Sequence, residues 1–275
     1  LKTIEQSDID RFPYLPYLDE FLSNYMSIFE LKCCLSSLEE YNVDYYLIDG
    51  SIYGDLQNPF PKGVETSAKA KKDLISATLN DFEEMVKNPS DKSVYSPKLF
   101  NKYFKIYQEH KYPYTLYLTT IERLVVLKEI LKNSRKMIAI SKSSSNNDIF
   151  HSNMPDIAIF DKYTQKEGIS KVIRKKVSKD INTTFPVFDE FFKDLKFTIF
   201  YLRLADYKNV LKVELPYEAS MAEIEEIATK LKKFSTNGYP YLLKKAHNDV
   251  VISDKNIKEL INIAKVREKS GREML

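Results

Sequence analysis

The sequence has few of the residues that build disulfide frameworks or membrane spans. Only two cysteines occur among 275 residues, and they are neighbours, Cys33 and Cys34. Adjacent cysteines rarely bridge each other, so we expect no disulfide framework and a reducing, cytoplasmic location. No run of about 18 apolar residues is present, which argues against a transmembrane helix. The first residues resemble no signal peptide and include no initiator Met, so we expect that the chain begins partway into a longer protein.

An excess of charge of one sign is also missing. The 42 Lys and Arg residues nearly balance the 39 Asp and Glu residues, for a net charge of +3. The chain is therefore no polycation, and a nucleic-acid site would have to be a local basic groove. A hydrophobic fraction of 43% is enough for the core of one large α/β domain. The abundance of Lys, Glu, Ile and Tyr is compatible with a thermophilic source.

The stretch 45–51, Tyr-Tyr-Leu-Ile-Asp-Gly-Ser, is central to the sequence. Its apolar run predicts a buried strand, and Gly50 permits a turn directly after it. Asp49 would then lie at the strand tip, where a carboxylate can hold a metal ion. The alternative is that Asp49 only caps the turn.

A helix is predicted over residues 18–40 from apolar residues at helical spacing. Glu30 is unusual in this helix, because Met26 and Cys34 flank it at i−4 and i+4. A Glu among apolar neighbours must be paired, protonated or bound to a cation. The alternative is a Glu at the edge of the helix that faces water.

Further elements follow from periodicity and turn residues. A loop is expected over 51–63, and a mostly helical insertion over 64–133, with helices at 68–86, 97–110 and 119–131 broken at Pro89 and Pro113. Strands are expected at 137–140 and 155–160, a hairpin from 197–204 and 210–215, a capping box at Ser220 and Glu223, and a charged amphipathic helix over 255–272. We expect the whole chain, 1–275, to form a single domain.

Two basic features are candidates for phosphate contacts. Lys142 follows the predicted strand 137–140 and precedes a polar loop, which suits a phosphate contact, although an ordinary surface Lys is the more common case. Five basic residues between 171 and 179 form a second possible patch.

The last informative run begins at Gly238, which ends one element, and Pro240 fits a first helical turn. Tyr239 and His247 are eight residues apart, which is about two helical turns, so they project from one helix face. Carboxylates together with one imidazole can hold Mn²⁺ or Mg²⁺ and leave positions open for water and phosphate. A lone His is, however, more often structural than a ligand.

These motifs together resemble the NurA family of archaeal nucleases. The resemblance rests on residues 47–51, 140–142, 200–204, 213–216 and 238–247, which occur in family order from Glu30 onward. It implies an RNase H-like α/β fold with a mixed sheet flanked by helices. It also implies Mn²⁺-dependent cleavage of DNA, with Mg²⁺ as an alternative ion, by 5′-to-3′ exonuclease and single-strand endonuclease activities in double-strand break end resection.

The resemblance also implies roles and partners. Glu30, Asp49 and His247 correspond to metal-holding residues, with Tyr239 as a companion in the active site, and Lys142 and Arg203 as contacts to DNA. A homodimer that docks on a hexameric HerA-type translocase is expected.

The sequence departs from the family at one point. The family pattern begins with a strand that carries an earlier Asp, and nothing before Glu30 resembles such a strand. Two hypotheses therefore stand: a metal-dependent deoxyribonuclease, and a catalytically impaired subunit that binds DNA and the translocase. An RNase H-like enzyme acting on RNA is a third, less favoured reading.

Overall fold

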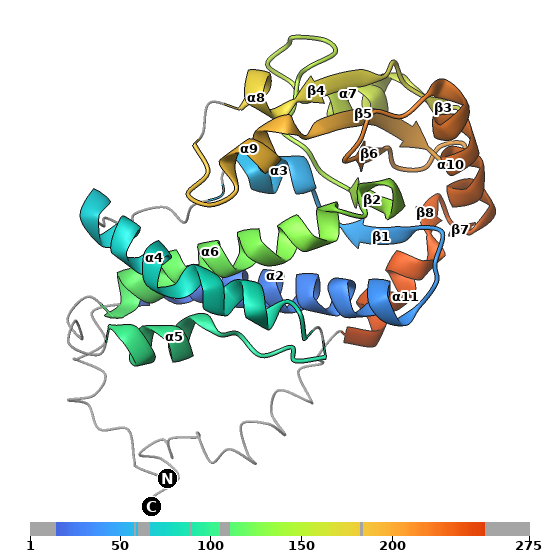
Figure 1. Ribbon diagram of the computed structural model, residues 1–275. Coiled ribbons are helices and arrows are strands. Elements are labelled where there is room, and N and C mark those ends of the chain that lie inside the picture. Colours follow the sequence, from blue (N-terminus) through green and yellow to red (C-terminus); the bar gives the residue numbers. More distant parts are fainter. Residues whose placement is uncertain are drawn as a thin grey trace, which may run out of the picture.

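The computed structural model describes residues 15–57, 59, 67–88, 90–104, 111–181 and 184–250. A mixed sheet forms one part of the molecule, and a layer of long helices lies against it (Figure 1). The sheet contains β1 (Tyr46–Asp49), β2 (Met137–Ser141), β3 (Gly168–Ile169), β4 (Ile173–Lys176), β5 (Lys196–Arg203) and β6 (Leu211–Leu215).

The strand order is β1-β2-β6-β5, and β5 pairs with both β3 and β4 along its other edge. β1 and β2 are parallel, and the other pairs are antiparallel. β2 and β6 are buried along their whole length, whereas β1 is only partly buried and ends in exposed Asp49. Asp49 therefore lies at the carboxyl end of the strand at one edge of the sheet.

The register places Ile48, Ala139 and Glu214 in one row across three strands. Ile48 and Ala139 belong to the core shared with the helical layer, whereas Ile138 and Val213 face a second core under α10 (Met221–Lys233). Because side chains alternate along a strand, Glu214 points toward the helical layer and the small Ala139 lies between it and Ile48.

The helical layer is built around one almost completely buried helix, α6 (Lys111–Leu131), whose polar residues Thr119 and Glu122 are also buried. The helices that pack on it are α2 (Leu15–Glu40), α4 (Ala68–Met85) and α5 (Ser96–Tyr103). This arrangement explains why buried apolar residues occur on every side of α6.

Short elements complete the described fold. These are α3 (Ile52–Gln57), the 3₁₀ turn η2 (Ser134–Lys136), α7 (Asp156–Tyr163), α8 (Val177–Asp180), α9 (Asp189–Asp194), β7 (Ser235–Thr236), β8 (Tyr239–Pro240) and α11 (Tyr241–Val250). Within the described ranges, no helix is long and apolar enough to cross a membrane.

Most of the predicted elements are confirmed. The first helix, the Asp49 strand, the strand at Met137, the antiparallel β5–β6 hairpin and the Ser220–Glu223 capping box are all present. The described elements between residues 67 and 131 are helices. The helix predicted over 97–110 corresponds to α5, which ends at Tyr103, and residues 105–110 lie outside the described residues. The helix predicted over 255–272 also lies outside them.

Three local predictions were wrong. Residues 155–160 form helix α7 and not a strand, because a short apolar run does not distinguish the two, and Asp156 favours a first helical turn. Residues 52–57 of the expected loop form α3, which buries Ile52, Tyr53 and Leu56. Pro113 does not separate two helices but lies in the first turn of α6, where a backbone N–H would have no partner within the helix, so its absence costs no hydrogen bond.

The start of the last helix also differs from expectation. Pro240 lies in β8, and α11 begins one residue later. Asn237 and Gly238 have positive φ values of 55° and 76°, so they form a two-residue hairpin turn between β7 and β8. A Cβ atom at Gly238 would lie 2.4 Å from Cβ of Lys208, which leaves room only for glycine.

Candidate active site

At the carboxyl end of β1, Asp49 and Asp55 lie close enough to Glu30 for their negative charges to act on it. Asp49 ends the strand, Glu30 comes from α2, and Asp55 comes from α3. The pKa of Glu30 is raised, first by the protein atoms packed around it and then by the negative charges of Asp49 and Asp55. Glu30 is solvent-exposed, yet it lies close enough to two other acids to be repelled by them. This is the electrostatic setting of a cation site.

Asp55 was not among the predicted site residues. Its pKa is also raised, first by desolvation, with Arg123 acting in the opposite direction and Glu214 adding to the rise. The sequence signal for it was an acid six residues after Asp49, which has meaning only once residues 52–57 are known to turn back as a helix. Because a loop was expected over 51–63, the sequence did not indicate where the Asp55 side chain would lie.

Two further predicted residues lie beside Asp49. The Lys142 Nζ is 3.5 Å from Asp49 Oδ2 and 4.4 Å from the centre of the Tyr239 ring. Burial tends to lower the pKa of Lys142, but Tyr239 and Asp49 outweigh it, so the pKa is raised and Lys142 stays charged. The pKa of Tyr239 is raised as well, chiefly by burial, with Asp49 adding and Lys142 opposing. The structure therefore brings Glu30, Asp49, Lys142 and Tyr239 together.

The Tyr239 hydroxyl is buried, and the polar groups that act on it are those of Lys142 and Asp49. Gly50, at φ 148°, and the Gly238 turn fix the two backbone segments that present Asp49 and Tyr239. The three side chains therefore form one connected polar cluster at the tip of β1.

His247 is exposed in the last turn of α11. The prediction that Tyr239 and His247 project from one helix face was wrong, because Tyr239 lies in β8, before α11 begins. Across the described ranges, no three Asp, Glu, His or Cys side chains are arranged to hold a metal ion. Glu30 and Asp49 thus supply hard oxygen ligands of the kind that Mn²⁺ and Mg²⁺ take, but His247 does not complete a three-ligand set here.

Arg203 lies elsewhere. Its side chain is 5% exposed, and Nη2 donates to carbonyl oxygens of Phe160, Asp161 and Thr164 at the carboxyl end of α7. A guanidinium at this position caps the helix and complements its dipole. The DNA contact expected of Arg203 stays a prediction.

The basic patch at 171–179 is mostly occupied by internal contacts. Lys175 pairs with Asp148 at 2.7 Å, Lys176 pairs with Asp194 at 3.5 Å, and Arg174 donates to the carbonyl of Ala219. These pairings leave less free positive charge on this surface than the sequence pattern indicated.

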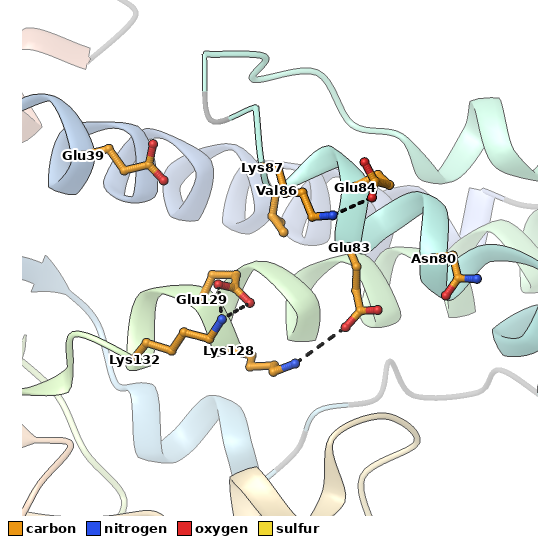
Figure 2. A pocket seen from close by; sticks show the side chains of 9 residues that line it. All are labelled: Glu39, Asn80, Glu83, Glu84, Val86, Lys87, Lys128, Glu129 and Lys132. Atoms are coloured by element: carbon orange, nitrogen blue, oxygen red, sulfur yellow. Dashed lines mark hydrogen bonds and ion pairs between the residues drawn. The ribbon is translucent and has the colours of Figure 1, made fainter.

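A groove of about 650 Å³ lies away from these carboxylates, between α4, α6 and the end of α2 (Figure 2). Its lysines are all paired with glutamates, as Lys128 with Glu83, Lys87 with Glu84 and Lys132 with Glu129. These pairs neutralise the lysines, so the groove offers no surplus positive charge to a nucleic acid.

The fold is a mixed α/β fold in which acids from a helix and a strand tip converge at one sheet edge. The NurA domain model matches residues 2–252, and the chain belongs to the NurA family. It is 29% identical to the probable DNA double-strand break repair nuclease NurA of Methanocaldococcus jannaschii over 94% of this chain and 68% of that protein.

Solved NurA structures share the fold. The NurA nuclease from Sulfolobus solfataricus superposes with a TM-score of 0.63 at 24% identity, over 89% of this chain and 66% of that one. A NurA structure bound to dAMP and manganese matches with a TM-score of 0.60 at 16% identity, over 93% of this chain and 78% of that one. The chain thus spans about two thirds of the length of the M. jannaschii and S. solfataricus proteins.

Proposed function

We propose that this protein is a metal-dependent deoxyribonuclease of DNA double-strand break end resection. The observation that carries the proposal is that Glu30 of α2 lies near Asp49 at the tip of β1 in a chain that belongs to the NurA family. The M. jannaschii relative is named as a double-strand break repair nuclease, which fits this chemistry.

Manganese, or magnesium in its place, suits this donor set. Glu30 and Asp49 would be its protein ligands, leaving several positions to water and to substrate phosphate. A divalent ion bound there activates water and neutralises phosphate charge. Lys142 holds positive charge beside Asp49 for the DNA backbone, and the Tyr239 hydroxyl lies next to both side chains. His247 is kept as a further ligand or proton-transfer group that substrate or partner binding would have to bring closer.

The finer activity follows the family resemblance. We propose 5′-to-3′ exonuclease and single-strand endonuclease activities, a homodimer, docking on a HerA-type hexameric translocase, and a cytoplasmic location. The helical segment 64–133 is proposed as an insertion within a single domain.

A second candidate function is a catalytically impaired subunit that still binds DNA and the translocase. The observation in its favour is that no three metal-binding side chains converge within the described ranges. The two candidates differ in one measurable respect, which is turnover.

The test is cleavage of linear DNA by the full-length protein over a Mn²⁺ titration, with Asp49→Asn as the variant. The change is nearly isosteric and removes the ligand charge, so turnover should fall by more than the roughly 10–100-fold that loss of an outer-shell partner costs. Asp81→Asn, which changes an acid of α4 paired with Lys102, is the matched control and should retain full activity. Absence of cleavage by the unmodified protein would favour the impaired subunit, and full activity of Asp49→Asn would exclude Asp49 from the metal site.

A further inference from the structure

The sheet contains a buried ion pair directly behind the candidate site. Lys212 and Glu214, both on β6, are 2% and 0% exposed, and Lys212 Nζ lies 2.7 Å from Glu214 Oε1. Burying two charges is costly, and apolar residues of similar volume often serve stability as well or better. The contacts of Glu214 indicate what the pair does.

The Glu214 carboxylate holds the turn that follows Asp49. The Ser51 hydroxyl donates to Oε1 at 2.6 Å, and the Tyr53 backbone N–H donates to Oε2 at 2.9 Å. Ser51 lies in the turn after β1 and Tyr53 in the first turn of α3, so both donors lie between Asp49 and Asp55. Both oxygens of one rigid, buried side chain thus fix the spacing between the two acids.

The same turn is fixed from a second side. Gly50 N–H donates to the carbonyl of Ile140, and the Ser141 hydroxyl donates to the carbonyl of Gly50. Lys212 is itself held by Asn146, through a contact of 3.2 Å from Nζ to Oδ1. Asn146 lies in the polar loop after Lys142, so β6 connects the turn behind Asp49 to the loop behind Lys142. Small Ala139 on β2, between β1 and β6, leaves room for Glu214 to reach the turn.

We propose that Glu214, oriented by Lys212, is a positioning residue that fixes Asp49, one of the two proposed ligands of the divalent cation, relative to the neighbouring acid Asp55. The inference rests on the proposed metal-dependent function and extends it to residues that do not touch metal or substrate. Outer-shell groups of this kind typically change metal affinity or activity by about 10–100-fold when they are removed.

The experiment uses the full-length protein with Lys212→Met and Glu214→Leu together, so that no unpaired charge is left buried. Mn²⁺ binding is followed by electron paramagnetic resonance, and cleavage of linear DNA is followed in parallel. The variant should fold, bind Mn²⁺ roughly 10–100-fold more weakly, and cleave correspondingly less at limiting Mn²⁺. Ser51→Ala, which removes one of the two hydrogen bonds and leaves the ion pair intact, should shift Mn²⁺ binding in the same direction by a smaller factor.

The matched control is Lys32→Met with Glu122→Leu, which removes a buried pair from the helical layer. It should leave Mn²⁺ binding unchanged. The positioning role would be overturned if the Lys212→Met, Glu214→Leu double variant and the Ser51→Ala variant both bound Mn²⁺ with wild-type affinity. An equal loss of Mn²⁺ binding in the helical control would also overturn it, since any buried pair would then have the same effect. Failure of the unmodified protein to cleave DNA while it binds Mn²⁺ would instead refute the proposed function and leave the Mn²⁺ comparison valid.

Discussion

In the part of the chain that the structure describes, the sheet and the helical layer each bury one lysine–glutamate pair, and the two pairs are built alike. In the helical layer, Lys32 Nζ lies 2.6 Å from Glu122 Oε1, with side chains 4% and 0% exposed. Glu122 also accepts the backbone N–H groups of Tyr95 and Ser96 at the start of α5. Glu214 likewise accepts the N–H of Tyr53 at the start of α3. In both parts a buried carboxylate, neutralised by a lysine, satisfies donors at a helix start.

The difference lies in what the held segment carries. The Glu122 pair fixes α5, whose buried residues Leu99 and Phe100 pack in the core. The Glu214 pair fixes α3, which carries Asp55, and the turn that directly follows Asp49. One device therefore serves packing in one part of the molecule and, by our proposal, cation geometry in the other. The role of a buried ion pair therefore depends on the segment whose backbone N–H groups its carboxylate accepts, and the pair alone does not indicate it.

The largest expected effect is on stability in the helical layer. Glu122→Ala leaves the Lys32 ammonium buried with the carbonyl of Ser93 as its remaining hydrogen-bond acceptor. Breaking one side of a buried pair typically costs about 3–5 kcal/mol of unfolding free energy. Urea unfolding measures the loss, and specific activity of the folded fraction should not change. A loss of activity per folded molecule would remove the contrast between the two pairs.

The next effect concerns the acids that Glu214 is proposed to position. Glu30 must be deprotonated to hold a cation, and its raised pKa means that protonation, with loss of activity, begins at a higher pH than for an ordinary Glu. Asp55→Asn removes one of the charges that raise this pKa, so the acid limb of the pH–rate profile should move to lower pH. Desolvation remains, so the limb should stay above the usual range.

The same substitution has a stability consequence of defined sign. Because the folded-state pKa of Glu30 is raised, protonation of Glu30 favours folding at low pH, and that contribution is lost as pH rises through the folded pKa. Removing the Asp55 charge should therefore slightly raise the melting temperature at neutral pH. Melting curves across the acid range check this, and an unmoved acid limb together with unchanged melting would show that Asp55 does not act on Glu30.

A smaller effect is expected for DNA binding. Lys142→Ala should weaken binding without sequence preference and reduce the salt dependence by about one unit of slope. Lys128→Ala, in the neutralised groove of the helical layer, is the matched control and should leave the slope unchanged. Binding isotherms over a range of salt concentrations measure both. Equal slopes for the two variants would make Lys142 an ordinary surface lysine.

The smallest stability change is expected for His247. It is exposed on α11, so His247→Ala should alter the unfolding free energy by no more than about 0.5 kcal/mol. A site role would instead appear as lost Mn²⁺-dependent turnover at full stability. Thermal melting and specific activity measured on the same preparation separate the two. A large drop in melting temperature with full activity would mark His247 as a packing residue.

The sequence predicted those parts of the fold that local patterns determine. Asp49 at a strand tip, the Ser220–Glu223 capping box and the β5–β6 hairpin each depend on a few adjacent residues. The short run that ends at Phe160 was misassigned because four consecutive apolar residues, 157–160, fit a helix and a strand equally well. The Asn237-Gly238 turn carried a usable hairpin signal that the interpretation of Pro240 as a helix start obscured.

The candidate site was harder to predict, because its connections are not local. Alternation in Leu-Lys-Val-Glu-Leu at 211–215 indicates a half-solvated strand, yet Lys212 and Glu214 are buried because they neutralise each other. The contact by which Arg203 caps α7 joins it to Thr164, 39 positions away, so adjacent residues gave no sign of it, and its expected contact with DNA stays a prediction. The sequence indicated the buried ion pair only through two opposite charges, two residues apart on β6. Recognising the pair as buried required knowing which elements cover that face of the sheet.

The two hydrogen bonds from the turn to Glu214 also bear on the order of folding. They join residues 163 and 161 positions apart, whereas Lys32 and Glu122 are 90 apart. Contacts between distant residues form only after the entropy of closing the intervening chain has been offset by other structure. The turn that holds Asp49 should therefore become ordered late, after β2 and β6 have paired. A partly folded chain would then lack the arrangement of acids proposed for cutting DNA, so the proposed activity would be acquired only as folding is completed.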